Sequence, residues 1–412
     1  MLGHVMSSSF TWLDYSERDR RRMLDVVDLF REKETRDELG IGVVRDAFAD
    51  MLFPGTSTIQ TRARYFLFIP WIYRDLERRR IGSAQVAAEA RKREIYLTKA
   101  LIGSEDDSGV FGKQAGASLK RLPSSVYWQG LGTWGIRLFP GSQDQYHRTL
   151  HVFYASIGRR QLTDDGEPVD GPLTRNWHAG LPSAPADFMK SSSFKLTTGE
   201  AEYLRERIMT SAPDTMLAYL VDQRQVLGTP DFPWLYPGSG TLPARIREQL
   251  FHARNFSEAM HGAALLYNLM LSEARGVEEL KSSYRERLTE WASSLEERAA
   301  ALENWDRAEF WEIVIRGEAR VAHPTRAFVD AWLDLALAPG VAASMPDNEA
   351  ARRLIEDREL ALKRGLARLH NRSALELWGG AAGAEQLWYR WSNARVIIAD
   401  ILAGLEEEGH GA

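Results

Sequence analysis

Six stretches with helical periodicity follow one another in the second half of this sequence, and they constrain the fold more than any other feature. Such stretches place apolar side chains on one face every three to four residues, and that face must be buried against another element. The chain has 412 residues, enough for two or three closely packed units. We therefore predict that residues 198–412 form a C-terminal helical domain. The stretches are 243–274, 276–303, 305–316, 324–337, 347–369 and 383–405.

Residues 1–102 are predicted to form an N-terminal helical region with basic helix ends. Pro54 and Gly55 end one apolar periodic stretch, because proline cannot donate a helical hydrogen bond and glycine favours turns. The very apolar stretch that follows is expected to begin with Thr56, Ser57 and Thr58 as helix caps and to bend at its internal proline. The expected helices cover residues 15–36, 43–52, 57–80 and 84–102.

Residues 103–197 differ from the rest of the chain in composition. They are rich in glycine and aromatic residues, and two short segments, 134–139 and 151–157, contain the branched and aromatic residues typical of strands. Helices are expected to resume at Thr198, because Thr197 and Glu200 have the spacing of a capping box. The predicted fold class is mainly α, a helical scaffold with a glycine- and aromatic-rich, partly β insert.

Composition excludes several kinds of chemistry. The chain has no cysteine, so it has no disulfide, thiol nucleophile or cysteine-held metal. Its nine histidines are scattered, and it contains no usable zinc-protease, nucleotide-binding or dinucleotide-binding motif, so we expect neither a metal ion nor a cofactor. Its first residues lack a signal peptide, and no apolar run reaches the ~18 residues of a membrane span. We expect a cytoplasmic protein that contacts no membrane.

Positive charge is concentrated in two segments of a chain whose net charge is −5. Residues 51–100 hold ten basic and four acidic residues, and residues 109–160 hold seven basic residues and one acidic residue. Residues 181–412 carry a net charge of −8. Such segregation favours a phosphate-binding surface, so we expect double-stranded DNA as the partner. The alternative is that these charges belong to ordinary solvated helix faces. The sequence identifies no protein partner.

The segment after Gly55 offers a clamp for DNA phosphates. Ser57 would cap a helix whose exposed N–H groups attract anions, with Thr61, Arg62 and Arg64 nearby. Guanidinium groups match phosphate oxygens well. Alternatively, both arginines form ion pairs with Asp46 or Asp50 of the preceding helix.

A second candidate site lies between residues 123 and 148. Aromatic side chains on a basic, glycine-rich surface are suited to stack an extruded base. Asp144 is the acidic residue of this segment, and cleavage of an N-glycosidic bond needs a carboxylate to activate water or stabilise the sugar cation. The alternative is that the tryptophans belong to the core and Asp144 to a turn. The expected base-binding residues are Tyr127, Trp128, Trp134 and Tyr146, and the additional phosphate-binding residues are Arg137 and Arg148.

The string GSQDQYH at 141–147 resembles the water-activating motif of uracil-DNA glycosylases. The resemblance implies catalytic roles for Gln143, Asp144 and His147. This chain departs from that motif, because Ser142 is inserted and glutamine replaces a proline at position 145. The second motif of that superfamily has only a weak counterpart, HPTR at 323–326, in an expected helix.

The strings RDELGIG, LFPGTSTIQTRARYFLFIPWIY, PSSVYWQGLGTWGIR and HGAALLYNLML together resemble a family of bacterial proteins of largely unassigned function found in phage-defence loci. The resemblance implies an antiviral DNA glycosylase that flips out and excises a glucosylated hydroxymethylcytosine, leaving an abasic site. The alternatives are a non-catalytic nucleic-acid-binding subunit of a defence system and a helical protein-interaction scaffold.

Overall fold

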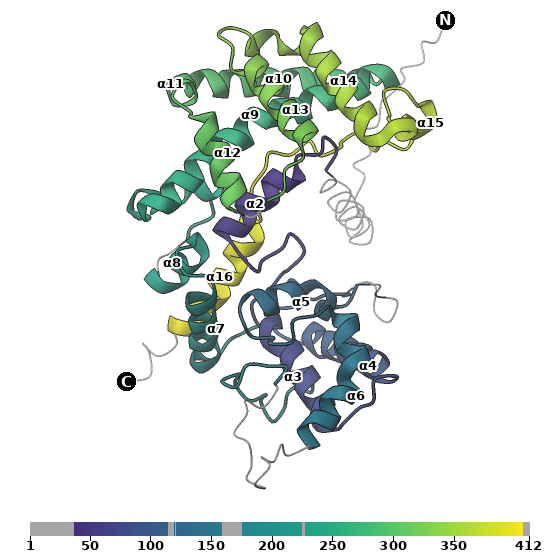
Figure 1. Ribbon diagram of the computed structural model, residues 1–412, viewed down its shortest axis with the longest axis vertical. Coiled ribbons are helices and arrows are strands. Elements are labelled where there is room, and N and C mark those ends of the chain that lie inside the picture. Colours follow the sequence, from purple (N-terminus) through teal and green to yellow (C-terminus); the bar gives the residue numbers. More distant parts are fainter. Residues whose placement is uncertain are drawn as a thin grey trace, which may run out of the picture. The chain divides into compact units, whose positions relative to one another are not determined.

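A computed structural model shows a mainly helical protein (Figure 1). The structure describes residues 37–113, 119, 121–158, 175–224, 227–317 and 319–406. The helix expected over residues 15–36 lies outside these ranges. Two compact units divide the chain, and the three-part division suggested by composition stays a prediction.

One unit contains residues 44–254, 306–320 and 388–412. Within it, α3 is buried along almost its whole length, from Tyr65 to Tyr73 and again at Leu76, and it contains Pro70. Helices α4 and α5 pack against α3, while α16 packs against α7 and α8. The helices of this unit are α2 (Gly42–Leu52), α3 (Tyr65–Arg78), α4 (Val86–Ile102), α5 (Pro123–Thr133), α6 (Gln143–Gly158), α7 (Thr198–Ser211), α8 (Met216–Gln223), the first part of α9 (Ala244–Arg275), α12 (Arg307–Arg316) and α16 (Trp391–Glu406), with the short η2 (Pro233–Leu235) and η3 (Ser239–Thr241).

The other unit contains residues 1–43, 255–305 and 321–387. Buried polar side chains of α9 form hydrogen bonds with irregular backbone. Ser257 donates to the Leu387 carbonyl. The Asn268 side chain donates to the Ala382 carbonyl and accepts from the Ala382 N–H. The helices here are the rest of α9, α10 (Glu278–Glu297), α11 (Ala299–Glu303), α13 (His323–Ala336), η4 (Ala342–Asp347), α14 (Glu349–Lys363), η5 (Arg364–Leu366) and α15 (Arg372–Glu376).

The prediction of a partly β insert is wrong for the described residues of 103–197. Segment 151–157 belongs to α6, where Tyr146 and Leu150 are buried one helical turn apart. Segment 134–139 contributes an isolated antiparallel bridge between Arg137 and Trp177. Gly130 and Gly132 lie inside α5, where the Gly55 carbonyl and the Arg137 side chain leave no room for a Cβ atom.

Two further helix boundaries differ from expectation. Residues 56–64 are not helical, and α3 begins at Tyr65, so the expected caps do not lie at a helix start. Residues 383–390 are irregular, because Tyr389 and Arg390 adopt left-handed φ values of 51° and 64° just before α16. The capping box of Thr197 and Glu200 is confirmed at the start of α7.

Candidate nucleic-acid interface

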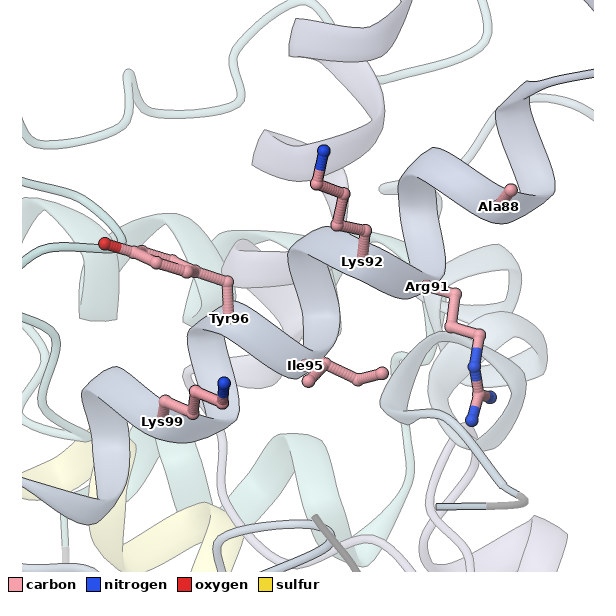
Figure 2. Close-up of a pocket in the computed structure, with 6 residues that line it drawn as sticks. All are labelled: Ala88, Arg91, Lys92, Ile95, Tyr96 and Lys99. Atoms are coloured by element: carbon pink, nitrogen blue, oxygen red, sulfur yellow. The ribbon is translucent and has the colours of Figure 1, made fainter. Parts of the chain in front are cut away.

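The outward side of α4 forms an open, basic surface, which we call the α4 face. Glu94, Leu97 and Leu101 lie on the opposite, buried side of the helix. Figure 2 shows the α4 face, with Arg91 and Lys92 pointing to opposite sides of the helix. The α4 face consists of Ala88, Arg91, Lys92, Ile95, Tyr96 and Lys99.

The α4 face carries cations that the described part of the chain does not neutralise. Neither Lys92 nor Lys99 has an ion-pair partner among the described residues, and both are exposed. The side chain of Tyr96 between them is 53% exposed, an unusual cost for so large a ring. By contrast, Arg93 on the same helix is paired with Asp75 of α3. The α4 face thus offers positive charge and one aromatic surface to solvent.

Both arginines of the expected phosphate clamp form internal ion pairs. Nε and Nη2 of Arg62 donate to the carboxylate of Asp400 in α16, at 2.9–3.1 Å. Nη1 of Arg62 donates to Asp106. Arg64 is buried and donates to Glu200 at 2.8 Å and to the Ser193 carbonyl at 3.0 Å. The structure therefore places these cations among carboxylates, and their phosphate-binding role stays a prediction.

The carboxylates proposed as alternative partners of this clamp pair with other arginines: Asp46 with its neighbour Arg45 at 3.0 Å, and Asp50 with Arg390. Arg390 donates to Asp50 at 2.5 Å and lies 3.8 Å from Asp46. Arg390 also donates to the Thr56 carbonyl, which ties it to the segment before α3.

The two remaining residues of the clamp lie in the irregular segment that precedes α3. Thr61 donates its hydroxyl to the Gly109 carbonyl at 2.7 Å and its N–H to Tyr127. The Ser57 hydroxyl oxygen is buried and has no hydrogen-bond partner among the described residues.

All four aromatic residues expected to bind a base are buried. The Tyr127 hydroxyl accepts from the Thr61 and Arg62 N–H groups, and Trp134 stacks on Phe66 with ring centroids 3.8 Å apart. Trp128 donates to the Gly141 carbonyl, and Tyr146 donates to Glu77. Their surroundings match the core alternative, and a base would have to displace these contacts to reach them.

The other two expected phosphate-binding residues and the expected catalytic carboxylate also have internal partners. Arg137 is buried, donates to the carbonyls of Trp128, Phe139 and Gly141, and lies over the Trp128 ring. Asp144 and Arg148 form an exposed pair one turn apart on α6, at 2.5 Å. Asp144 therefore lies at the surface, although its charge still acts on His147 one turn away.

Gln143 and His147 instead join a buried polar cluster. The Gln143 amide donates to the Tyr73 hydroxyl at 2.6 Å and to the Ser124 hydroxyl at 2.8 Å, and His147 Nε2 lies 3.1 Å from the Tyr73 hydroxyl. Ser124 in turn donates its hydroxyl and its N–H to Glu94 at 2.7 and 2.8 Å. Sequence reading overlooked Tyr73, Ser124 and Glu94, because their meeting depends on three separate helices.

Burial determines the protonation behaviour of this cluster. It raises the pKa of Glu94 to about 7, although the hydrogen bonds from Ser124 act in the opposite direction. Burial also raises the pKa of Tyr73 and lowers that of His147, which favours a neutral imidazole. A fully buried carboxyl with such a pKa exchanges protons near neutral pH.

The described ranges contain neither a cluster of metal ligands nor a helix suited to span a membrane. No set of three or more His, Asp or Glu side chains within them could hold a metal ion. Among the same residues, no helix combines the length and apolar character needed to cross a bilayer.

The chain is therefore a mainly helical protein that has a basic helix face and a buried polar cluster. Residues 6–404 match the model of the DUF6361 family, described as a family of unknown function, and the chain belongs to it. No curated protein and no solved structure matches the chain.

Proposed function

We propose that the chain binds nucleic acid through the α4 face. One observation carries this proposal: Lys92 and Lys99 are exposed without ion-pair partners among the described residues, with Tyr96 between them. The two lysines are seven positions apart, which places them on the same side of the helix, about 10 Å apart along its axis. A polyanion with regularly spaced phosphates is the partner that such a surface favours.

The contrast with the neighbouring arginines supports this choice of site. Arg62, Arg64 and Arg93 already have carboxylate partners, so a phosphate would have to displace those pairs. Lys92 and Lys99 have no such ion pair to lose among the described residues. Binding there adds a favourable charge interaction and releases the counterions of the nucleic acid.

The test is the salt dependence of binding to a labelled duplex of about 20 base pairs, measured by fluorescence anisotropy between 50 and 200 mM salt. Each phosphate charge neutralised on B-form DNA contributes a slope of about 0.9 in log K against log salt. The Lys92→Gln, Lys99→Gln double variant is therefore expected to lose up to about 1.8 of that slope.

A matched control removes two positive charges from exposed helix positions of the other unit. The Arg353→Gln, Arg372→Gln double variant has the same net charge as the test variant, and the two arginine side chains are 75% and 92% exposed. It is expected to keep the wild-type slope. Equal slopes for both variants and the wild type would overturn the proposal.

A second candidate function is the excision of a modified cytosine from phage DNA, and it rests on the resemblance to the glycosylases. Its supporting observation is that Gln143 and His147, two of the three expected catalytic residues, both lie within hydrogen-bonding distance of the Tyr73 hydroxyl. The test is incubation with phage DNA that carries glucosylated hydroxymethylcytosine, followed by mass spectrometry of released bases. Absence of a released base under conditions where the protein binds that DNA would remove this candidate.

A further inference from the structure

The α4 face contains an apolar strip beside its lysines. At 100° per residue, Ala88 and Ile95 lie between Arg91 on one side and Lys99, Lys92 and Tyr96 on the other. Figure 2 shows Arg91 and Lys92 diverging in this way. Ala88 is near the start of the helix and adds almost no bulk, so the helix can approach a surface closely there.

From this arrangement we infer that α4 enters the major groove of B-form duplex DNA, with Ile95 against the floor of the groove and Lys92 and Lys99 toward one of its phosphate strands. The inference rests on the proposed function and specifies its partner. The major groove of B-form DNA is about 12 Å wide and admits an α-helix of about 10–12 Å diameter. Helix α4 has 17 residues, so it is about 25 Å long and spans such a groove.

The composition of the α4 face favours a duplex over a single strand. Single-strand binding surfaces stack successive bases on several aromatic side chains. Among the six residues of the α4 face, Tyr96 is the one aromatic residue, and the apolar strip is aliphatic. An aliphatic side chain contacts the thymine methyl group, which only the major groove presents.

The A form of duplex RNA is a poor fit for the same reason. Its major groove is deep and narrow, and side chains cannot read it. A helix that uses its outward face would have to bind such a duplex by its phosphates alone.

The charges that surround α4 do not oppose this orientation. Asp106 and Asp107 follow the helix, and they are paired with Arg62 and Lys113. Glu89 lies beyond Tyr96, outside the six residues of the α4 face. Arg91 also lies close enough to the buried Glu94 to lower its pKa, so its charge acts toward both sides of the helix.

The experiment compares four ligands at one salt concentration. They are an A·T-rich DNA duplex, the same duplex with uracil in place of thymine, its single strand, and the RNA duplex of the same sequence. The wild-type protein is expected to bind the thymine duplex at least tenfold more tightly than the single strand or the RNA duplex. Removing the methyl group that Ile95 contacts is expected to weaken binding by about fourfold, the effect of burying one methyl-sized group.

The variant Ile95→Ala tests whether Ile95 causes the difference in affinity between the thymine and uracil duplexes. It is expected to bind the thymine and uracil duplexes equally, whereas the control Ile315→Ala, which alters an exposed isoleucine of α12, keeps the wild-type preference. The uracil comparison uses the wild-type protein, so it decides the matter even if Ile95→Ala does not fold.

The outcomes separate this inference from the proposed function. Equal binding of thymine and uracil duplexes, or binding of RNA or single strands as tight as that of the DNA duplex, would overturn the major-groove inference and leave nucleic-acid binding in place. Loss of the salt slope in the Lys92→Gln, Lys99→Gln variant would then still support the α4 face. Absence of salt-dependent binding to all four ligands would overturn both.

Discussion

Arg62 and Asp400 form a two-pronged ion pair although 338 residues separate them in the chain. Nε and Nη2 of the guanidinium lie 2.9–3.1 Å from the carboxylate oxygens, and the Ala63 N–H donates to the same carboxylate at 2.8 Å. Both side chains are nearly buried, and burial is the main reason that the pKa of Asp400 is raised. This pair fastens the segment before α3 to α16.

Loss of the Asp400 charge is therefore expected to destabilise the protein more than it affects DNA binding. Asp400→Asn leaves a buried guanidinium without its main partner, at a cost of about 3 kcal/mol, although relief of the desolvation that raises the pKa of Asp400 offsets part of that cost. Urea denaturation measures this change. The control Glu349→Gln alters a carboxylate that is 82% exposed and is expected to stay within about 0.5 kcal/mol of the wild type. Equal stability of the two variants would contradict a structural role for the pair.

The pKa of Glu94 predicts a pH dependence of stability. Because burial raises this pKa from 4.5 to about 7, the folded state favours the protonated carboxyl. Its stabilising contribution is complete below about pH 4.5 and is lost as the pH rises through about 7, at no more than about 1.4 kcal/mol per pH unit. The variant Glu94→Gln keeps an acceptor for Ser124 and removes this dependence.

The measurement is the difference in melting temperature between wild type and Glu94→Gln at a series of pH values. The difference should grow in favour of the variant between pH 5 and 7. His147 has a lowered pKa and acts in the opposite direction, because its unfolded form takes up a proton below about pH 6.5. Comparing the two proteins at each pH cancels its contribution. A constant difference would mean that Glu94 does not titrate in this range.

The variant Asp144→Asn tests whether Asp144 acts in catalysis or only forms a surface ion pair with Arg148. The carboxylate is 75% exposed and pairs with Arg148 one turn away, so its removal is expected to change the free energy of unfolding by less than about 0.5 kcal/mol. If Asp144 activates water as the glycosylase hypothesis requires, base release falls by orders of magnitude in a stable protein. A single-turnover assay on modified duplex, run beside a thermal melt, gives both answers. Unchanged base release would exclude Asp144 as the catalytic carboxylate.

Gly130→Ala is expected to destabilise the protein although alanine is the better helix former. A Cβ atom at this position would collide with the Gly55 carbonyl oxygen and come within 3.0 Å of Phe66. Relief of that overlap requires movement of backbone, at a cost of about 1–3 kcal/mol. The control Gly199→Ala adds a Cβ that meets nothing within 4 Å, and it is expected to raise stability slightly. Melting temperatures that move in the same direction for both variants would contradict this packing argument.

Helical periodicity predicted most of the helices because it reports local burial. The 243–274 stretch corresponds closely to α9, and Pro54 and Gly55 follow α2 as expected. Glycine content was a poorer guide: it contributed to the prediction of a partly β insert, yet Gly130 lies in α5, where the Gly55 carbonyl approaches it from elsewhere in the chain. A pattern in one segment cannot reveal which distant segment will pack against it.

The candidate site illustrates the same distinction. The two basic segments were visible in the sequence, yet the arginines singled out within them, Arg62 and Arg64, have carboxylate partners at positions 400 and 200. Lys92, Tyr96 and Lys99 could have been identified from the polar side of the 84–102 helix, since the apolar residues define its buried side. Which of several cations stays unpaired depends on the tertiary fold.

The long stretch of sequence between α8 and α16 affects the order in which the protein can fold during synthesis. Helix α16 packs against α7 and α8, and its Asp400 holds Arg62. At the usual 5–20 residues per second, a ribosome needs roughly 20 to 70 s to proceed from position 62 to position 400. In the part of that interval that follows the synthesis of α8, the apolar surfaces of α7 and α8 lack the helix that packs against them. Nascent chains that have passed Gln223 but are stalled before Trp391 should therefore bind chaperones, whereas chains that include α16 should not.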